Sequence, residues 1–101
     1  MIIKILKRDG RIEFFDKKKI ADAIFKAAQA CGGKNRDMAA GLADLVVKAA
    51  EVKFVDKIPS VEDIQDLVEE VLINEGHAQT AKAYILYRER RQEARKISAL
   101  I

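Results

Sequence analysis

The Asp9-Gly10 pair near the start of the chain constrains the fold more than any other feature. It separates two short apolar runs, Ile2–Leu6 and Ile12–Phe15. An Asp-Gly pair between β-forming residues is typical of a β-hairpin, because the type I′ turn requires positive φ at both central residues. The sequence therefore predicts a hairpin at the N-terminus. Three cations flank the turn and would share its tip: Lys7, Arg8 and Arg11.

The predicted turn also sets the pairing of the two strands. With Asp9 and Gly10 as the turn residues, three cross-strand pairs follow: Arg8 with Arg11, Lys7 with Ile12, and Leu6 with Glu13. Two facing arginines repel each other, so an anion between them would relieve the repulsion. The alternative is a solvated hairpin whose cations bind nothing, and the residues alone leave both interpretations open.

Asp16 predicts the start of a helix directly after the hairpin, since aspartate is a preferred N-cap residue. Three lysines then fall in the first turn, where positive charge opposes the helix dipole and costs stability. Lys19 could reach a phosphate held at this N-terminus by free backbone N–H groups. Lys17 and Lys18 are expected to be exposed. Positive charge at both the hairpin tip and the helix start indicates a polyanionic ligand.

Apolar residues at helical spacing predict four helices after the hairpin. They should span about residues 17–30, from 35 or 36 to 52, from Ser60 to a stop at Gly76, and 78–97. Ser60 and Asp63 form a predicted capping box. The third helix carries a clear apolar stripe, expected to be buried: Ile64, Leu67, Val68, Val71 and Leu72. The predicted fold class is α+β, an N-terminal β-hairpin packed over a bundle of four helices.

The bulk composition limits the classes of protein to consider. The chain has 101 residues, enough for one domain with a modest core. Its net charge of +3 permits nucleotide binding without demanding nucleic acid. A single cysteine, Cys31, excludes an internal disulfide and a cysteine-rich zinc site, and is expected to be buried as a small hydrophobe. No apolar stretch is long enough to cross a bilayer, and we expect a cytoplasmic location.

Further candidate binding residues lie outside the hairpin tip and the helix start. Glu13 could balance the nearby cations or accept hydrogen bonds from a ribose or an amine. Arg88 and Arg91 are three residues apart on the predicted fourth helix and share a face, and guanidinium groups can bind phosphate through two hydrogen bonds. The alternative for these arginines is a charged outer helix face.

The sequence shows no convincing group of residues for catalysis or for binding a metal ion. His77 has no second ligand at a useful spacing, so it is expected to cap or pack a helix. Cys31 has no general base beside it in the sequence. The chain contains no phosphate-binding loop of the Gly-x4-Gly-Lys-Ser/Thr type. The last residues, 98–101, form an apolar stub, which suggests that more chain follows.

Several segments together resemble the ATP-cone, the allosteric nucleotide-binding module best known at the N-terminus of ribonucleotide reductases. They are Lys7-Arg8-Asp9-Gly10-Arg11 with Phe15-Asp16, Ile64-Gln65-Asp66, and Tyr84-Ile85-Leu86-Tyr87-Arg88. The resemblance spans roughly residues 2 to 95 and implies a cone domain over residues 1–97. Lys7-Arg8-Asp9-Gly10-Arg11 and Tyr87-Arg88 look most like the anaerobic ribonucleoside-triphosphate reductase form.

The resemblance implies a non-catalytic regulatory domain. ATP bound here would keep an attached or partner ribonucleotide reductase active, and dATP would turn it off. The nucleotide would arrive with Mg²⁺, and the reductase catalytic domain would be the partner, with a homo-oligomer as an open option. The implied nucleotide-binding residues are Lys7, Arg8, Asp9, Gly10, Glu13, Lys19, Arg88 and Arg91.

The sequence leaves two other interpretations of the protein class open. Cones also occur behind a zinc ribbon in a transcriptional repressor of reductase genes, but no cysteine precedes Cys31 here, which disfavours that parent. A small helical DNA- or protein-interaction module is the alternative from another class. It predicts binding that falls steeply with salt and ignores which mononucleotide is present. The mild net charge does not demand nucleic acid, and we do not expect nucleic acid as the partner.

Overall fold

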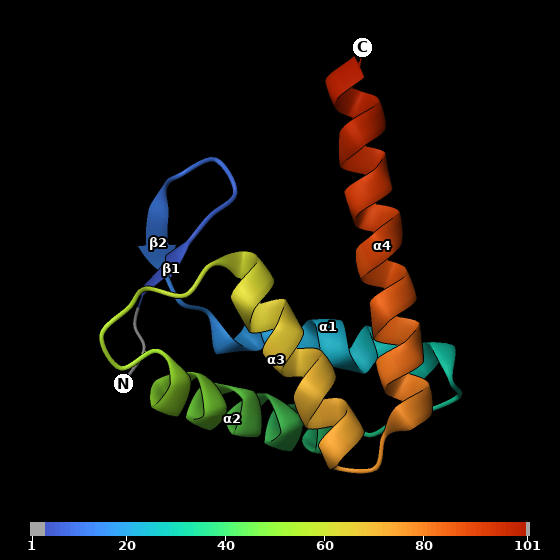
Figure 1. Ribbon diagram of the computed structural model, residues 1–101. Coiled ribbons are helices and arrows are strands. Elements are labelled where there is room, and N and C mark those ends of the chain that lie inside the picture. Colours follow the sequence, from blue (N-terminus) through green and yellow to red (C-terminus); the bar gives the residue numbers. More distant parts are fainter. Residues whose placement is uncertain (1–3, 101) are drawn as a thin grey trace.

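The computed structural model describes residues 4–100 as an antiparallel hairpin followed by four helices, which confirms the predicted α+β class (Figure 1). The hairpin consists of β1 (Lys4–Leu6) and β2 (Ile12–Phe14). The helices are α1 (Lys17–Ala30), α2 (Arg36–Lys53), α3 (Val61–Asn74) and α4 (Ala78–Leu100). The predicted bounds of α1 are confirmed at both ends, and α4 continues past the expected end at Ile97.

The hairpin is present, but the predicted register and turn type are wrong. Leu6 pairs with Ile12, and Ile5 with Glu13. The Lys7 N–H donates to the Arg11 carbonyl (2.7 Å), and the Gly10 N–H donates to the Lys7 carbonyl (3.0 Å). Gly10 has φ of 87°, whereas no non-glycine residue among those described has positive φ. A three-residue loop with glycine alone in the left-handed region therefore replaces the type I′ turn, because Asp9 keeps an ordinary φ.

This shift of one residue changes which side chains meet. Arg8 belongs to the loop and does not face Arg11. Arg11 instead contacts Asp9 (2.5 Å between Nε and Oδ2) and Glu13 (3.2 Å between Nη1 and Oε1). The repulsive pair of arginines expected at the tip is absent, so the argument for an anion between them does not hold.

Side chains cap two of the helices as the sequence predicts. Asp16 accepts a hydrogen bond from the Lys18 N–H at the start of α1. Ser60 and Asp63 form the reciprocal capping box of α3, with distances of 2.9 and 3.0 Å. The Leu6 N–H donates to the Pro59 carbonyl at 2.9 Å, just before that box. The base of the hairpin is therefore fixed beside the N-terminus of α3.

The core lies where α1, α2, α3 and the first turns of α4 meet. Ile24, Val46, Val68 and Leu72 are its largest fully buried apolar side chains apart from Pro59. All five residues of the predicted stripe on α3 are buried, which confirms that prediction. Cys31, by contrast, is exposed, and its thiol donates to the Gln79 carbonyl at 3.4 Å. The expected burial of Cys31 is wrong because it lies beyond the last turn of α1, where the chain leaves the core.

Helix α4 extends well beyond the body of the domain (Figure 1). Its buried residues are Thr80, Ala81 and Tyr84, and every residue from Glu89 to Leu100 is exposed. The hairpin and the distal part of α4 rise from the same side of the bundle. Among residues 4–100, no helix combines the length and apolar character needed to span a membrane.

Candidate functional site

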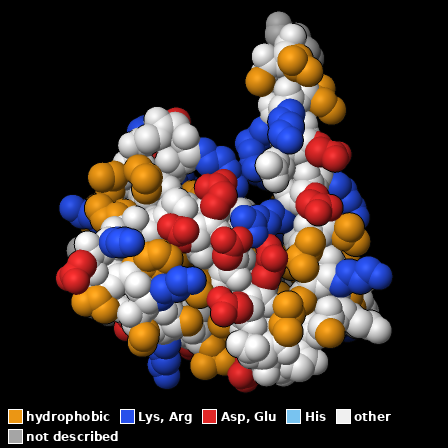
Figure 2. Space-filling view, in the orientation of Figure 1, with side chains coloured by type: hydrophobic (Ala, Val, Ile, Leu, Met, Phe, Trp, Pro, Cys, Tyr) orange, Lys and Arg blue, Asp and Glu red, His pale blue; other side chains and the backbone are white. Residues whose placement is uncertain are grey.

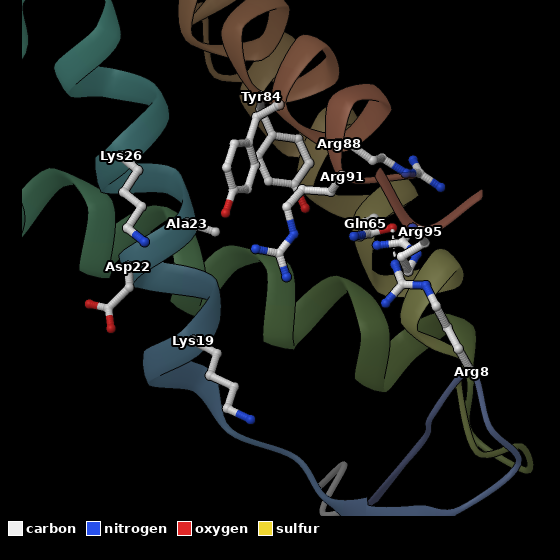
Figure 3. A pocket seen from close by; sticks show the side chains of 11 residues that line it. Arg8, Lys19, Asp22, Ala23, Lys26, Gln65, Tyr84, Arg88, Arg91 and Arg95 are labelled. Atoms are coloured by element: carbon white, nitrogen blue, oxygen red, sulfur yellow. Dashed lines mark hydrogen bonds between the residues drawn. The ribbon is translucent and has the colours of Figure 1, made fainter. Parts of the chain in front are cut away.

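A basic groove of about 410 Å³ lies between α1 and α4 (Figure 3). Side chains from four elements line it. They are Lys19, Asp22, Ala23 and Lys26 of α1, Gln65 of α3, Tyr84, Tyr87, Arg88, Arg91 and Arg95 of α4, and Arg8 of the hairpin tip. The groove therefore has six cations and a single carboxylate, a strong imbalance for a chain whose net charge is only +3.

Helical spacing explains how the two walls are built. On α1, Lys19, Ala23 and Lys26 follow an i, i+4, i+7 pattern and share one face. The small Ala23 side chain lies between the two lysines and keeps the groove open (Figure 3). On α4, the three arginines at positions 88, 91 and 95 follow an i, i+3, i+7 pattern and line the groove.

Four of the groove cations have no carboxylate partner within the described range, residues 4–100: Lys19, Lys26, Arg91 and Arg95. The guanidinium of Arg91 lies 5.8 Å from the centre of the Tyr87 ring. Asp22, the one carboxylate in the groove, is 3.5 Å from Arg36, which does not line the groove. These unpaired charges repel each other, and an anion in the groove would remove that repulsion.

The other two cations are paired with acidic residues of α3. Arg8 contacts Glu62 (2.8 Å between Nε and Oε1). Arg88 contacts Asp66 at 2.7 Å and Glu69 at 2.5 Å. Burial acts against the charge on Arg88, but its hydrogen bonds to these two carboxylates outweigh burial and raise the pKa of the guanidinium. Arg88 is therefore partly neutralised within the domain.

A smaller apolar pocket of about 180 Å³ adjoins the groove. The two share Lys19, Ala23, Gln65 and Tyr84. The remaining lining is mostly apolar and comes from the hairpin, α1 and α3, with Ile5, Phe15, Ile20, Val61, Ile64 and Val68 among its members. An apolar pocket that opens into a cationic groove suits a ligand with a flat apolar end and a polyanionic end.

The structure brings some of the predicted site residues together and leaves others aside. Arg8, Lys19, Arg88 and Arg91 line the groove, and Lys7 lines the apolar pocket. Three predicted residues lie outside both: Asp9, Gly10 and Glu13. Glu13 contacts Lys7 at 3.7 Å and Arg11 at 3.2 Å.

Asp9 and Gly10 serve the loop itself. Asp9 accepts hydrogen bonds from the backbone N–H of Arg11 (3.1 Å) and from its side chain, and both lower the pKa of the Asp9 carboxyl. Gly10 provides the positive φ that the loop requires. These two residues shape the tip, while Arg8 is the tip residue that reaches the groove.

The sequence analysis did not identify Lys26, Gln65 or Arg95 as residues of the site, although all three line the groove. Lys26 is seven residues after Lys19, and Arg95 is four after Arg91, so helical spacing alone places each on the face of a candidate already chosen. Gln65 lies in the recognised Ile64-Gln65-Asp66 segment, but its position between groove and pocket depends on packing between helices.

Tyr84 allows a pH dependence to be predicted. Its burial raises the pKa of the phenol to about 12 from an ordinary value of 10.0. Between these values the unfolded chain has lost the proton while the folded chain keeps it, so the free energy of unfolding falls as pH rises above 10. We expect the free energy of unfolding to fall by about 2–3 kcal/mol between pH 10 and about pH 12. Urea unfolding at several pH values would measure it, and an equal pH dependence in Tyr84→Phe would contradict the assignment.

Among residues 4–100, no group of three or more histidine, cysteine, aspartate or glutamate side chains could hold a metal ion.

The hairpin, the four helices and the groove define a small α+β domain with a concentrated cationic site next to an apolar pocket. The sequence matches the ATP cone domain over residues 3–93, nearly the whole chain, and the protein belongs to the ATP-cone family. Its sequence relatives are ribonucleotide reductases, in which the ATP-cone is a regulatory domain.

Three relatives illustrate the range of reductases to which this chain is similar. A vitamin B12-dependent ribonucleoside-diphosphate reductase of Thermoplasma acidophilum is 43% identical over 106 residues, covering 100% of this chain and 13% of that protein. A protein of the same description from Mycobacterium tuberculosis is 38% identical over 97% of this chain and 14% of that protein. An anaerobic ribonucleoside-triphosphate reductase of Salmonella typhimurium is 34% identical over 91% of this chain and 12% of that protein. The chain thus spans about one seventh of these relatives or less, and they include both diphosphate and triphosphate reductases.

Proposed function

We propose that this domain binds ATP or dATP in the groove between α1 and α4 and thereby regulates a ribonucleotide reductase, either attached or a partner. The observation that carries the proposal is the juxtaposition of six cations with an adjoining apolar pocket. Membership of the ATP-cone family and the reductase relatives support it. The domain itself performs no chemistry in this proposal.

The groove provides what a triphosphate requires. Lys19 and Lys26 approach from α1, and Arg91 and Arg95 from α4, so phosphate oxygens between the helices would meet donors on both sides (Figure 3). A guanidinium can form two parallel hydrogen bonds with a phosphate, whereas lysine acts as a point charge. Because these four cations carry no ion pair among residues 4–100, the ligand would gain their charge without first breaking a salt bridge.

The adjoining pocket is the proposed position of the base. Its apolar lining would bury the faces of a purine, while Gln65 and Tyr84 stand at the junction with the groove. The Gln65 amide offers both a donor and an acceptor, which matches the polar edge of adenine. Since burial keeps the Tyr84 phenol protonated well above neutral pH, its hydroxyl remains available as a donor. Lys7 would approach from the hairpin side.

Regulation requires that ATP and dATP favour different states of the domain. The two ligands differ by one 2′-hydroxyl, so the difference in free energy between the states must come from contacts near the ribose. A coupling of about 1–3 kcal/mol would be enough to change the activity of a partner severalfold or more. Mg²⁺ would arrive with the triphosphate, coordinated by phosphate oxygens and water.

Isothermal titration calorimetry of the purified chain with ATP, dATP and GTP, each with Mg²⁺, tests the proposal. We expect saturable binding of ATP and dATP, weaker binding of GTP, and a loss of roughly tenfold in affinity in Lys7→Ala, the value of one hydrogen bond to a charged group. Binding that ignores the base and falls steeply with salt would instead favour a nucleic-acid interface. No heat with any nucleotide, from a chain that circular dichroism shows to be folded, would refute the proposal.

A further inference from the structure

The tip of the hairpin is tied to the first turn of α3 by Arg8. Its guanidinium lies 2.8 Å from Glu62 and 3.4 Å from the side-chain oxygen of Gln65. The base of the hairpin is held separately, by the backbone hydrogen bond from Leu6 to Pro59. Among residues 4–100, the side-chain hydrogen bonds and ion pairs between the tip and α3 all involve Arg8. The position of the tip relative to the groove therefore depends on what Arg8 binds.

Glu62 belongs to an acidic stripe on α3. With Asp66 and Glu69 it follows an i, i+4, i+7 pattern, so the three carboxylates share one helix face. Figure 2 shows acidic side chains over α3 close to the basic side chains of α4. This face pairs with two of the arginines that line the groove, Arg8 and Arg88. The stripe thus occupies, within the domain, two of the six cations that would otherwise be open to an anionic ligand.

The two arginines are held with different strength. The Arg88 side chain is 20% exposed and contacts two carboxylates, whereas the Arg8 and Glu62 side chains are 36% and 50% exposed and form a single ion pair. Ion pairs as exposed as the second contribute little stability, so a strong anion can replace the carboxylate. Arg8 is the cation that can exchange partners, while Arg88 is part of a more stable cluster.

We propose that Glu62 is a built-in competitor of the anionic ligand for Arg8. This inference rests on the function proposed above. Without ligand, Glu62 holds Arg8 and the hairpin tip against α3. A polyphosphate in the groove takes Arg8 from Glu62, and the tip moves with the guanidinium while Leu6 keeps the hairpin base in place. Glu62 thereby lowers the affinity for nucleotide and couples occupancy of the groove to the position of the tip.

The test compares Glu62→Gln with Glu70→Gln by calorimetry with ATP and Mg²⁺. Both variants remove one negative charge from α3, but Glu70 is exposed and lines neither the groove nor the apolar pocket. We expect Glu62→Gln to bind ATP roughly three- to fivefold more tightly than the wild type, the range set by an exposed ion pair. Glu70→Gln should bind like the wild type.

A double-mutant cycle separates competition for Arg8 from a general effect of charge. In an Arg8→Ala background, Glu62→Gln should no longer increase the affinity. An equal gain in that background, or a wild-type Kd in Glu62→Gln, would overturn the competitor role while leaving nucleotide binding intact. Absence of ATP binding in every protein, the wild type included, would overturn the proposed function and this inference together.

Discussion

Replacing Lys19 and Arg91 together by alanine is expected to weaken ATP binding by roughly 100-fold or more, because a hydrogen bond to a charged group contributes about 1.5–3 kcal/mol. The two side chains enter the groove from opposite walls, α1 and α4 (Figure 3). Neither has a carboxylate partner among residues 4–100, so their removal leaves no unpaired acidic group behind. Affinity should therefore fall while the free energy of unfolding changes little.

The matched control is the double variant Lys48→Ala and Arg90→Ala. It removes the same two kinds of charge from α2 and α4, and both residues are exposed and line neither the groove nor the apolar pocket. Its affinity for ATP should stay within about twofold of the wild type, since exposed charges outside the groove are screened by salt. Equal losses in the two double variants, measured by calorimetry at one salt concentration, would show that only net charge matters and would contradict the proposed groove contacts.

Ile24→Ala is expected to destabilise the domain by about 2–5 kcal/mol, through lost apolar burial and the cavity left behind. Ile24 is 0% exposed and lies on α1 within the core cluster. Since small domains are stable by about 5–15 kcal/mol, this one change removes a large share of the total. Urea unfolding monitored by circular dichroism gives the free energy directly.

Ile73→Ala on α3 makes the same chemical change at a side chain that is 56% exposed. It should cost about 0.5 kcal/mol or less. A similar loss at both positions would mean that Ile24 is not part of a tightly packed core. In that case α1 could not serve as a rigid wall of the groove.

Local signals were sufficient for the helices and insufficient for the hairpin register. Asp16, the Ser60 and Asp63 box, and the stripe from Ile64 to Leu72 each act within one or two turns, so the sequence shows them directly. The register of the hairpin depends on whether Asp9 adopts positive φ, and Asp-Gly is compatible with more than one turn. The structure uses Gly10 alone, and every pair in the hairpin shifts accordingly.

The candidate site was predicted in part for a related reason. Arg88 and Arg91 were found because spacing along a helix shows which residues share a face. Lys19 was found because it lies in the first turn of the predicted helix, where backbone N–H groups are free. The pairing of Arg8 with Glu62 joins residues 54 positions apart in the sequence, and no pattern within either segment indicates it. The assignment of Arg88 as a ligand-binding residue likewise could not anticipate its two carboxylate partners on α3.

The exposed part of α4 has a mechanical consequence. From Glu89 to Leu100 every residue of the helix is exposed. At 1.5 Å per residue this segment is about 18 Å long, so a rotation of about 10° at its base moves its end by about 3 Å. Arg91 and Arg95 lie on this segment and also line the groove. A ligand that draws these arginines towards α1 would therefore act on a lever arm, and a small displacement in the groove would become a larger one at the end of the helix.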